Sequence, residues 1–126
     1  TEALSTQPGL SFVVQEPQLG TAHALLMAEP ALAGRRGTVV LLSGDVPLLR
    51  PQTLHSLVDR HHATGAATTV LTAVVDRPTG YGRIVRSGGQ IAGIVEEKDA
   101  SEAEREIREI NAGIYAFDLD GLFDAV

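Results

Sequence analysis

The chain has 126 residues, of which 44% are hydrophobic and 21% charged. This length suits one folded domain, and the composition excludes wholesale disorder, a collagen-like repeat and a coiled coil. Sixteen acidic against ten basic residues give a net charge of −6, which argues against a nucleic acid or an anionic membrane surface as partner. Cysteine is absent, which excludes thiolate metal sites and suits the reducing cytoplasm, where we expect the protein. The longest aliphatic run, Val39 to Leu42, is far shorter than the roughly 18 apolar residues of a membrane span.

The first segment combines a β-prone run with a loop and a helix. Phe12–Val14 predicts a short strand, and Pro17 and Gly20 predict a loop after it. Thr21 is a candidate helix cap, because apolar residues recur at near-helical spacing behind it. Pro30 predicts a kink or a restart of that helix.

The middle of the chain predicts a strand, a helix and a second strand. Residues 38–42 are apolar without alternation, which favours a strand covered on both faces in a parallel sheet. Pro51 suits the first turn of a helix that closes near His61–Gly65. Residues 68–75 are rich in β-branched side chains and predict the second strand. We therefore expect an α/β layered fold.

The last third predicts shorter elements. Residues 81–86 and 90–97 read as an antiparallel hairpin around Ser87-Gly88-Gly89, forming a small flap. Ser101 and Glu104 have the spacing of a capping box, which opens a short helix. A last strand over Gly113–Phe117 and a helix beginning near Asp118 complete the predicted elements.

Asp45 is the strongest candidate for chemistry. It follows a predicted buried strand, and ligands of open α/β sheets bind outside the carboxyl ends of strands. A carboxylate there could hold a divalent cation that bridges phosphate oxygens. The alternative is that Asp45 only shapes the turn from Gly44 to Pro47.

Two loops also combine unusual residue types. Gln15–Thr21 places a side-chain amide, a glycine and a helix start together, which could present donors to a base or phosphate, although it lacks a Walker-type lysine. Without that lysine, an ordinary strand-to-helix loop is the favoured interpretation. In Asp76–Arg83 a proline and two glycines surround Tyr81, which indicates either a tight turn or a backbone that approaches a ligand closely.

Glu96 and Asn111 are weaker candidates. Period-two geometry puts Glu96 and Lys98 on one face and Glu97 on the other, a pattern that usually means a solvated edge. Asn111 stands before a predicted strand, either for its amide or to form a turn. His61 and His62 are adjacent on a predicted helix and diverge, so they cannot chelate together.

Five motifs follow one another within residues 12–117. They are Gln15-x-x-Gln18-Leu19-Gly20-Thr21-x-His23-Ala24, Gly44-Asp45-Val46-Pro47-Leu48, Pro78-Thr79-Gly80-Tyr81-Gly82-Arg83-Ile84, Ile94-Val95-Glu96-x-Lys98-Asp99 and Glu109-Ile110-Asn111-x-Gly113. In this order they resemble one family, the uridyltransferase domain of the bifunctional bacterial N-acetylglucosamine-1-phosphate uridyltransferase and glucosamine-1-phosphate acetyltransferase.

The resemblance implies a Rossmann-like nucleotidyltransferase fold, a mostly parallel layered sheet with a small antiparallel flap. It implies an enzyme that joins UTP and N-acetylglucosamine 1-phosphate, with Mg²⁺, into UDP-N-acetylglucosamine and pyrophosphate for cell-wall peptidoglycan synthesis. Asp45 would be the catalytic metal ligand, beside Ser43 and Gly44 at the nucleotide. The remaining implied contacts are Gln15, Gly20 and Thr21 on the uridine side, and Gly82, Glu96 and Asn111 around the sugar.

The resemblance also has gaps. The family's opening glycine-rich loop, its second metal ligand and its hexapeptide-repeat acetyltransferase domain have no counterpart in this sequence. We therefore expect residues 1–126 to be one partial domain, truncated at both ends, that is inactive alone, with a homo-oligomeric full-length protein, a trimer by resemblance. A non-catalytic sugar-nucleotide binding module and a pyrophosphorylase for another sugar phosphate or nucleotide remain alternatives.

Overall fold

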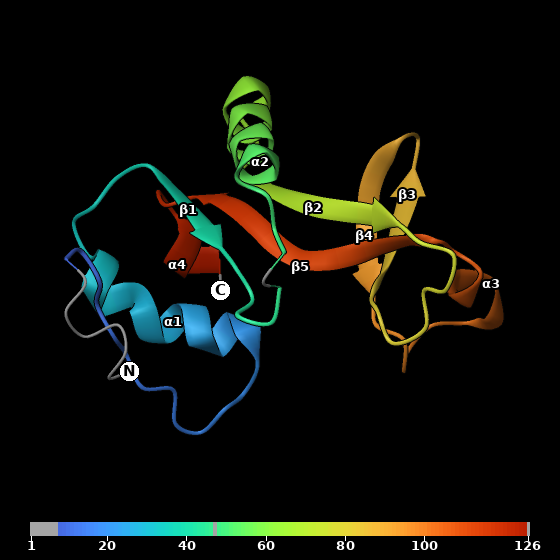
Figure 1. Ribbon diagram of the computed structural model, residues 1–126, viewed down its shortest axis with the longest axis horizontal. Helices are drawn as coiled ribbons and strands as arrows, with labels where there is room; N and C mark the ends of the chain where they lie inside the picture. Colours follow the sequence, from blue (N-terminus) through green and yellow to red (C-terminus); the bar gives the residue numbers. More distant parts are fainter. Residues whose placement is uncertain (1–7, 47, 126) are drawn as a thin grey trace. The chain divides into compact units, whose positions relative to one another are not determined.

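The computed structural model describes residues 8–46 and 48–125, which divide into two compact units (Figure 1). The larger unit spans residues 38–117, and the smaller one joins the residues up to Gly37 with those from Asp118 onward. The larger unit contains a sheet of five strands with helices, so the expected α/β class is confirmed. Its elements are β1 (Thr38–Leu41), α2 (Pro51–Thr64), β2 (Thr68–Val74), β3 (Arg83–Ser87), β4 (Gln90–Val95), α3 (Glu102–Arg105) and β5 (Glu109–Asp118).

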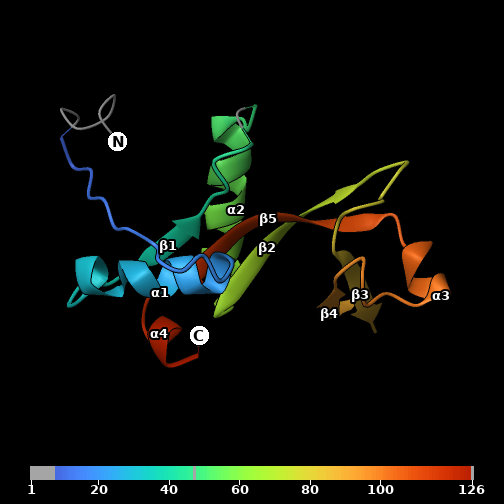
Figure 2. The ribbon, with the colours of Figure 1, turned by 90° about the horizontal axis from the view of Figure 1, so that it is seen from below.

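The pairing of the strands differs from a mostly parallel sheet. The strand order is β1-β5-β3-β4, with β2 also on β5, and the described registers of β2 with β5, β3 with β5 and β3 with β4 are all antiparallel. In Figures 1 and 2, β1 and β2 point the same way and β5 runs the opposite way. The predicted strand, helix and strand are therefore present as β1, α2 and β2, but β5 lies between β1 and β2 in the sheet. An apolar run reports burial on both faces, and it says nothing about the direction of the neighbouring strand.

The core of the larger unit lies between α2 and β5. Leu57 of α2 is buried together with Ile114 and Ala116 of β5. Partly buried side chains from β1, from the loop before α2, from α2 itself and from β2 pack against this cluster: Val40, Leu49, Leu54 and Leu71. The helix that supplies Leu57 begins at Pro51, as predicted, and ends at Gly65, whose left-handed backbone (φ 59°) lets its N–H donate to the His61 carbonyl at 3.1 Å.

Replacing Leu57 with alanine should lower the free energy of unfolding by about 2 to 4 kcal/mol, because the buried side chain leaves a cavity between helix and sheet. Urea unfolding of this chain measures the loss. Leu48→Ala is the matched control, since Leu48 is 90% exposed and its truncation should change the free energy by less than about 0.5 kcal/mol. Equal losses in the two variants would contradict this description of the core.

The predicted antiparallel flap is confirmed. β3 and β4 pair through a two-residue loop of Gly88 and Gly89, whose φ angles of 57° and 81° are both positive, as a type I′ hairpin turn requires. The predicted capping box is also present. Ser101 Oγ accepts from the Glu104 N–H at 3.3 Å, and the Glu104 carboxylate accepts from the Ser101 N–H at 2.8 Å.

A bidentate ion pair ties the flap to β5. Arg86 donates to both carboxylate oxygens of Glu109, at 2.7 and 2.8 Å. This hydrogen bonding, helped by a weaker bond from Thr72, lowers the pKa of Glu109 from its ordinary value of 4.5 to about 2. Because the folded pKa is depressed, the pair stabilises the fold fully above pH 4.5. That stability is lost as the pH falls from 4.5 through about 2.

Glu109→Gln should therefore lower the free energy of unfolding at pH 7 by about 1 kcal/mol, the upper end for an exposed ion pair. Most of the difference between the variant and the original chain should be lost at pH 2, where about half of the folded molecules carry a protonated Glu109. Urea unfolding at the two pH values measures this. A difference that persists unchanged at pH 2 would contradict the assignment of the effect to the Glu109 charge.

The smaller unit contains α1 (Thr21–Leu32) and α4 (Leu122–Ala125). Helix α1 matches the prediction from residue 21 and continues through Pro30, but Gly20 rather than Thr21 is its N-cap. The predicted strand over Phe12–Val14 is wrong: these residues form no strand, and their side chains are 49 to 74% exposed. A β-prone run becomes a strand only where another strand supplies hydrogen bonds.

Two predicted boundaries shift near the end of the chain. The last strand begins at Glu109 rather than Gly113 and continues through Asp118, so the final helix begins at Leu122. Asn111 therefore lies within β5 rather than before it. Within the described ranges, no helix is both long enough and apolar enough to cross a membrane.

Candidate functional site

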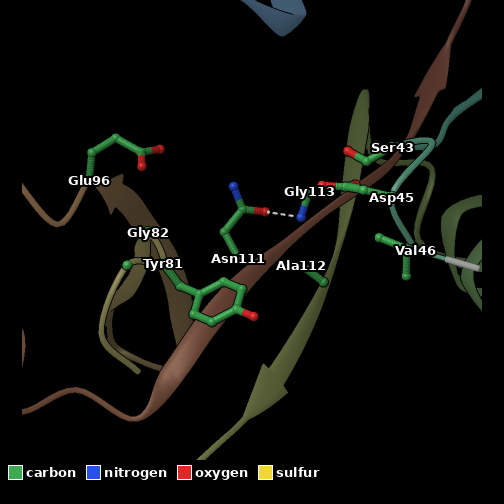
Figure 3. A pocket seen from close by; sticks show the side chains of 10 residues that line it. Ser43, Asp45, Val46, Tyr81, Gly82, Glu96, Asn111, Ala112 and Gly113 are labelled. Carbon is green, nitrogen blue, oxygen red and sulfur yellow. Dashed lines mark hydrogen bonds between the residues drawn. The ribbon is translucent and has the colours of Figure 1, made fainter. Parts of the chain in front are cut away.

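A pocket of about 310 Å³ opens over β5 in the larger unit, and it collects residues from four of the predicted motifs. Figure 3 shows Asn111 between two groups, with Gly82 and Glu96 on one side and Ser43 and Asp45 on the other. The lining residues are Ser43, Asp45, Val46, Gly80, Tyr81, Gly82, Glu96, Asn111, Ala112 and Gly113.

An irregularity in β5 forms the floor of this pocket. Between the paired positions Val70/Tyr115 and Thr72/Asn111, β2 has one residue whereas β5 has three, residues 112–114. The extra residues bulge out of the ladder, and Gly113 adopts the positive φ of 71° that few side chains tolerate. The bulge therefore takes Ala112 and Gly113 out of regular pairing, and they line the pocket together with Asn111, the last paired residue before the bulge.

The Asn111 side chain is held in one orientation. Its Oδ1 accepts from the Gly113 N–H at 2.9 Å, and its Nδ2 donates to the Tyr115 hydroxyl at 2.6 Å. Each of these amide atoms keeps capacity for one more hydrogen bond. Asn111 thus presents an oriented donor and acceptor to the pocket, which explains an asparagine inside a strand better than turn formation alone.

Gly82 and Glu96 lie in close contact beside Asn111. The Asn111 N–H donates to the Gly82 carbonyl at 2.9 Å, which attaches the Gly80–Gly82 loop to β5. A Cβ added at Gly82 would stand 3.2 Å from Glu96 Oε1 and 3.1 Å from Ile94 Cγ2. Only glycine leaves room here for the Glu96 carboxylate in its present position.

Ser43 and Asp45 reach the pocket from the loop after β1. Both are exposed, and a Cβ added at Gly113 would stand 3.4 Å from Ser43 Oγ, so this loop lies directly against the bulge. Gly44 lies between the two lining residues, and Pro47 of the same predicted motif lies outside the described residues. The strand end thus delivers Asp45 to the side of the pocket opposite Glu96 (Figure 3).

The structure brings together five of the nine residues predicted to form the site: Ser43, Asp45, Gly82, Glu96 and Asn111. Their ligands and roles stay predictions. Gln15, Gly20 and Thr21 belong to the smaller unit, so their relation to the pocket also stays a prediction. Within that unit Gln15 Nε2 donates to the Gly20 carbonyl at 2.9 Å and hydrogen bonds His23 Nδ1 at 3.1 Å.

The sequence reasoning missed the supporting residues of the pocket. Tyr115 orients Asn111, and Gly113 permits the bulge, but neither was singled out for those roles. The Asn-x-Gly spacing was the available signal, because an asparagine often bonds the backbone two residues ahead where the chain turns. Tyr115 offered no such signal, since an aromatic residue in a strand usually packs, as it also does here against Phe117 at 5.6 Å between ring centroids.

The oxygen donors around the pocket suit magnesium. Mg²⁺ takes one or two protein carboxylates and completes its shell with water and phosphate oxygens, and Asp45 supplies one carboxylate on the side of the pocket opposite Glu96. No group of three or more His, Cys, Asp or Glu side chains in residues 8–46 and 48–125 could hold a metal ion by itself. The Mg²⁺ expected at Asp45 stays a prediction.

The adjacent histidines of α2 do not act together. His61 is buried and hydrogen bonds Thr69 Oγ1 at 3.0 Å, while His62 bonds Thr38 Oγ1 at 2.8 Å. The two rings thus connect α2 to two different strands.

Comparison with known proteins defines the class. The sequence matches the nucleotidyl transferase family over residues 2–125, and the chain belongs to that family. Among individual relatives it is 56% identical over 117 residues to the bifunctional protein GlmU of Syntrophotalea carbinolica, and 55% identical over 118 residues to GlmU of Geobacter metallireducens. It is 57% identical over 120 residues to GlmU of Pelotomaculum thermopropionicum. These matches cover 93 to 94% of this chain but 25 to 26% of each relative, so the chain spans about a quarter of their length.

Proposed function

We propose that the chain carries part of the active site of a uridyltransferase that joins UTP to N-acetylglucosamine 1-phosphate. The observation that carries this proposal is the pocket itself, which gathers Asp45 from the end of β1 with Gly82, Glu96 and Asn111. These residues come from separate motifs of a nucleotidyl transferase sequence. The resemblance of the five sequence motifs supplies the particular substrates of the proposal, and the similarity to bifunctional GlmU proteins supports it.

The two sides of the pocket suit different parts of such substrates. A carboxylate accepts hydrogen bonds from sugar hydroxyls, and an amide can both donate and accept, so Glu96 and Asn111 suit an N-acetylated sugar. Gly82 leaves space between them for a ring to approach. On the opposite side Asp45 suits the phosphates and their cation, in the manner of other metal-dependent phosphoryl transfer.

The proposed reaction needs no covalent enzyme intermediate. A phosphate oxygen of the sugar phosphate attacks the α-phosphorus of UTP, a new P–O bond forms, and the bond from the α-phosphorus to the bridging oxygen breaks to release pyrophosphate. Bound Mg²⁺ would supply charge neutralisation at the phosphate oxygens. Asp45 would hold that cation, while Glu96 and Asn111 would orient the sugar, so the protein contributes mainly by positioning its substrates.

The activity is tested by pyrophosphate release from the full-length gene product with UTP, N-acetylglucosamine 1-phosphate and Mg²⁺. We expect turnover that EDTA abolishes, and little turnover with dTTP and glucose 1-phosphate. Turnover with the second pair alone would favour a pyrophosphorylase of other specificity. Binding of UDP-N-acetylglucosamine without turnover would favour a non-catalytic module.

The 126-residue chain alone should bind UDP-N-acetylglucosamine poorly and turn over UTP barely or not at all, because it spans about a quarter of the length of its relatives. Robust Mg²⁺-dependent turnover by this chain would contradict the proposal that it carries only part of the site. The proposal also includes a cytoplasmic, homo-oligomeric full-length protein whose product serves peptidoglycan synthesis. Light scattering of the full-length gene product tests the oligomer.

A further inference from the structure

The Gly80–Gly82 loop, which lines the pocket on one side, is also hydrogen bonded on its other side. Alternation along the flap places Gly82 and Glu96 at the pocket, while Arg83 and Glu97 line a second pocket of about 390 Å³. Neither Arg83 nor Glu97 lines the first pocket. Arg83 and Glu97 can therefore affect the first pocket only indirectly, by fixing the position of the loop between the two pockets.

Arg83 is the most deeply buried charged residue of the described chain, at 1% exposed. Its guanidinium donates to Glu97 Oε2 at 2.6 Å and to the Tyr81 carbonyl, and it reaches the Arg105 carbonyl at 3.4 Å. Its Nε has no hydrogen-bond partner among the described residues. A buried guanidinium with one carboxylate partner depends strongly on that partner.

Glu97 joins this arginine to the loop. The carboxylate oxygen that receives the Arg83 hydrogen bond also accepts from the Gly80 N–H at 3.2 Å. The bonds from Arg83 and Gly80 lower the pKa of Glu97 below its ordinary value, so the side chain is charged at neutral pH. Gly80, Tyr81 and Gly82 are thus each held by a backbone hydrogen bond, to Glu97, Arg83 and Asn111 respectively.

We propose that Arg83 and Glu97 are positioning residues that fix the Gly80–Gly82 loop, and thereby Gly82 against Glu96, on the sugar side of the pocket. The inference rests on the proposed function only for the identity of the sugar. The structural part, an ion pair behind the loop that sets its backbone, stands on hydrogen bonds and burial within the larger unit. The Gly80–Gly82 loop borders the side of the pocket proposed for the sugar, opposite Asp45. Loss of the Arg83–Glu97 pair should therefore weaken binding of the sugar and spare binding of the nucleotide.

The test compares Glu97→Ala and Glu97→Gln in the full-length gene product. Glu97→Ala should raise the KM for N-acetylglucosamine 1-phosphate about tenfold and the KM for UTP less than twofold. Glu97→Gln retains an acceptor oxygen but loses the charge, so it should show a smaller rise in the same substrate. Glu106→Ala is the matched control, because Glu106 lines the second pocket yet makes no side-chain hydrogen bond to the Gly80–Gly82 loop in the described residues. Equal rises for both substrates would overturn the inference.

Hydrogen exchange of the Gly80 amide in the full-length gene product gives a readout that does not need activity. Glu97→Ala should accelerate that exchange at least tenfold and Glu97→Gln by a smaller factor, because Gln retains one acceptor oxygen, while Glu106→Ala should leave it unchanged. Glutamine has nearly the same size and shape as glutamate, so Glu97→Gln should keep the fold. Its result therefore decides the test if Glu97→Ala does not fold. Unchanged Gly80 exchange in Glu97→Gln would overturn the inference even if the uridyltransferase is confirmed. An inactive full-length protein with accelerated exchange would overturn the proposed function alone.

Discussion

Replacing Asp45 with alanine in the full-length gene product should reduce pyrophosphate release at least about 100-fold and leave the urea unfolding midpoint unchanged. The side chain is exposed, so the fold gains little from it. In the proposed reaction the same carboxylate holds the cation at the phosphates. Asp59→Ala is the matched control, because Asp59 is an exposed carboxylate on α2 that does not line the pocket.

Retained turnover in the Asp45 variant would contradict the proposal that Asp45 holds the cation. It would favour the alternative that Asp45 only shapes the turn after β1. Raising the Mg²⁺ concentration adds a second criterion. A weakened cation site should regain part of its activity at high Mg²⁺, whereas Asp59→Ala should respond to Mg²⁺ as the original protein does. A loss of activity accompanied by a lower unfolding midpoint would instead indicate a structural role.

Gly82→Ala should raise the KM for N-acetylglucosamine 1-phosphate about tenfold or more, with a much smaller effect on UTP. The added methyl would stand 3.1 Å from Ile94 Cγ2 and 3.2 Å from Glu96 Oε1, so the Glu96 carboxylate must move by a few tenths of an ångström. Displacement of that size matters in a site that acts by positioning. Initial rates with each substrate varied in turn measure the effect.

Gly93→Ala provides the matched control for this variant. Gly93 lies on the neighbouring strand β4, its φ is not positive, and a Cβ added there meets no atom within 4 Å. Its replacement should leave both KM values unchanged and leave stability equal or slightly higher. If Gly82→Ala and Gly93→Ala change the KM values for N-acetylglucosamine 1-phosphate and UTP by the same factors, the close contact of Gly82 with Glu96 has no role in sugar binding.

Local signals in the sequence predicted most of the elements. Pro51 with the apolar stripe behind it predicted α2, the β-branched run predicted β2, and Ser101 with Glu104 predicted α3. The Gly88-Gly89 pair predicted the hairpin turn of the flap. Each of these signals is decided by residues within one turn or one strand, and such decisions need no knowledge of the tertiary structure.

The pairing of the strands and the shape of the pocket needed contacts between distant residues. Nothing in residues 38–75 indicates that β5, more than thirty residues later, separates β1 from β2. The burial of Arg83 was equally hidden, because an arginine near a hairpin is usually exposed. Asp45, Glu96 and Asn111 could be proposed together only through the family resemblance, whereas the structure places them around one pocket by geometry.

The extra residues of β5 have a consequence for how this domain can evolve. A deletion of Ala112 and Gly113 would give β5 as many residues as β2 in this stretch, complete the ladder and keep the buried Ile114, which would favour stability. The same deletion would withdraw the Asn111 amide and its Gly113 partner from the cavity. Under the proposed function, thermal robustness and sugar recognition therefore impose opposite demands on the length of one strand, and we expect the longer version where recognition is under selection.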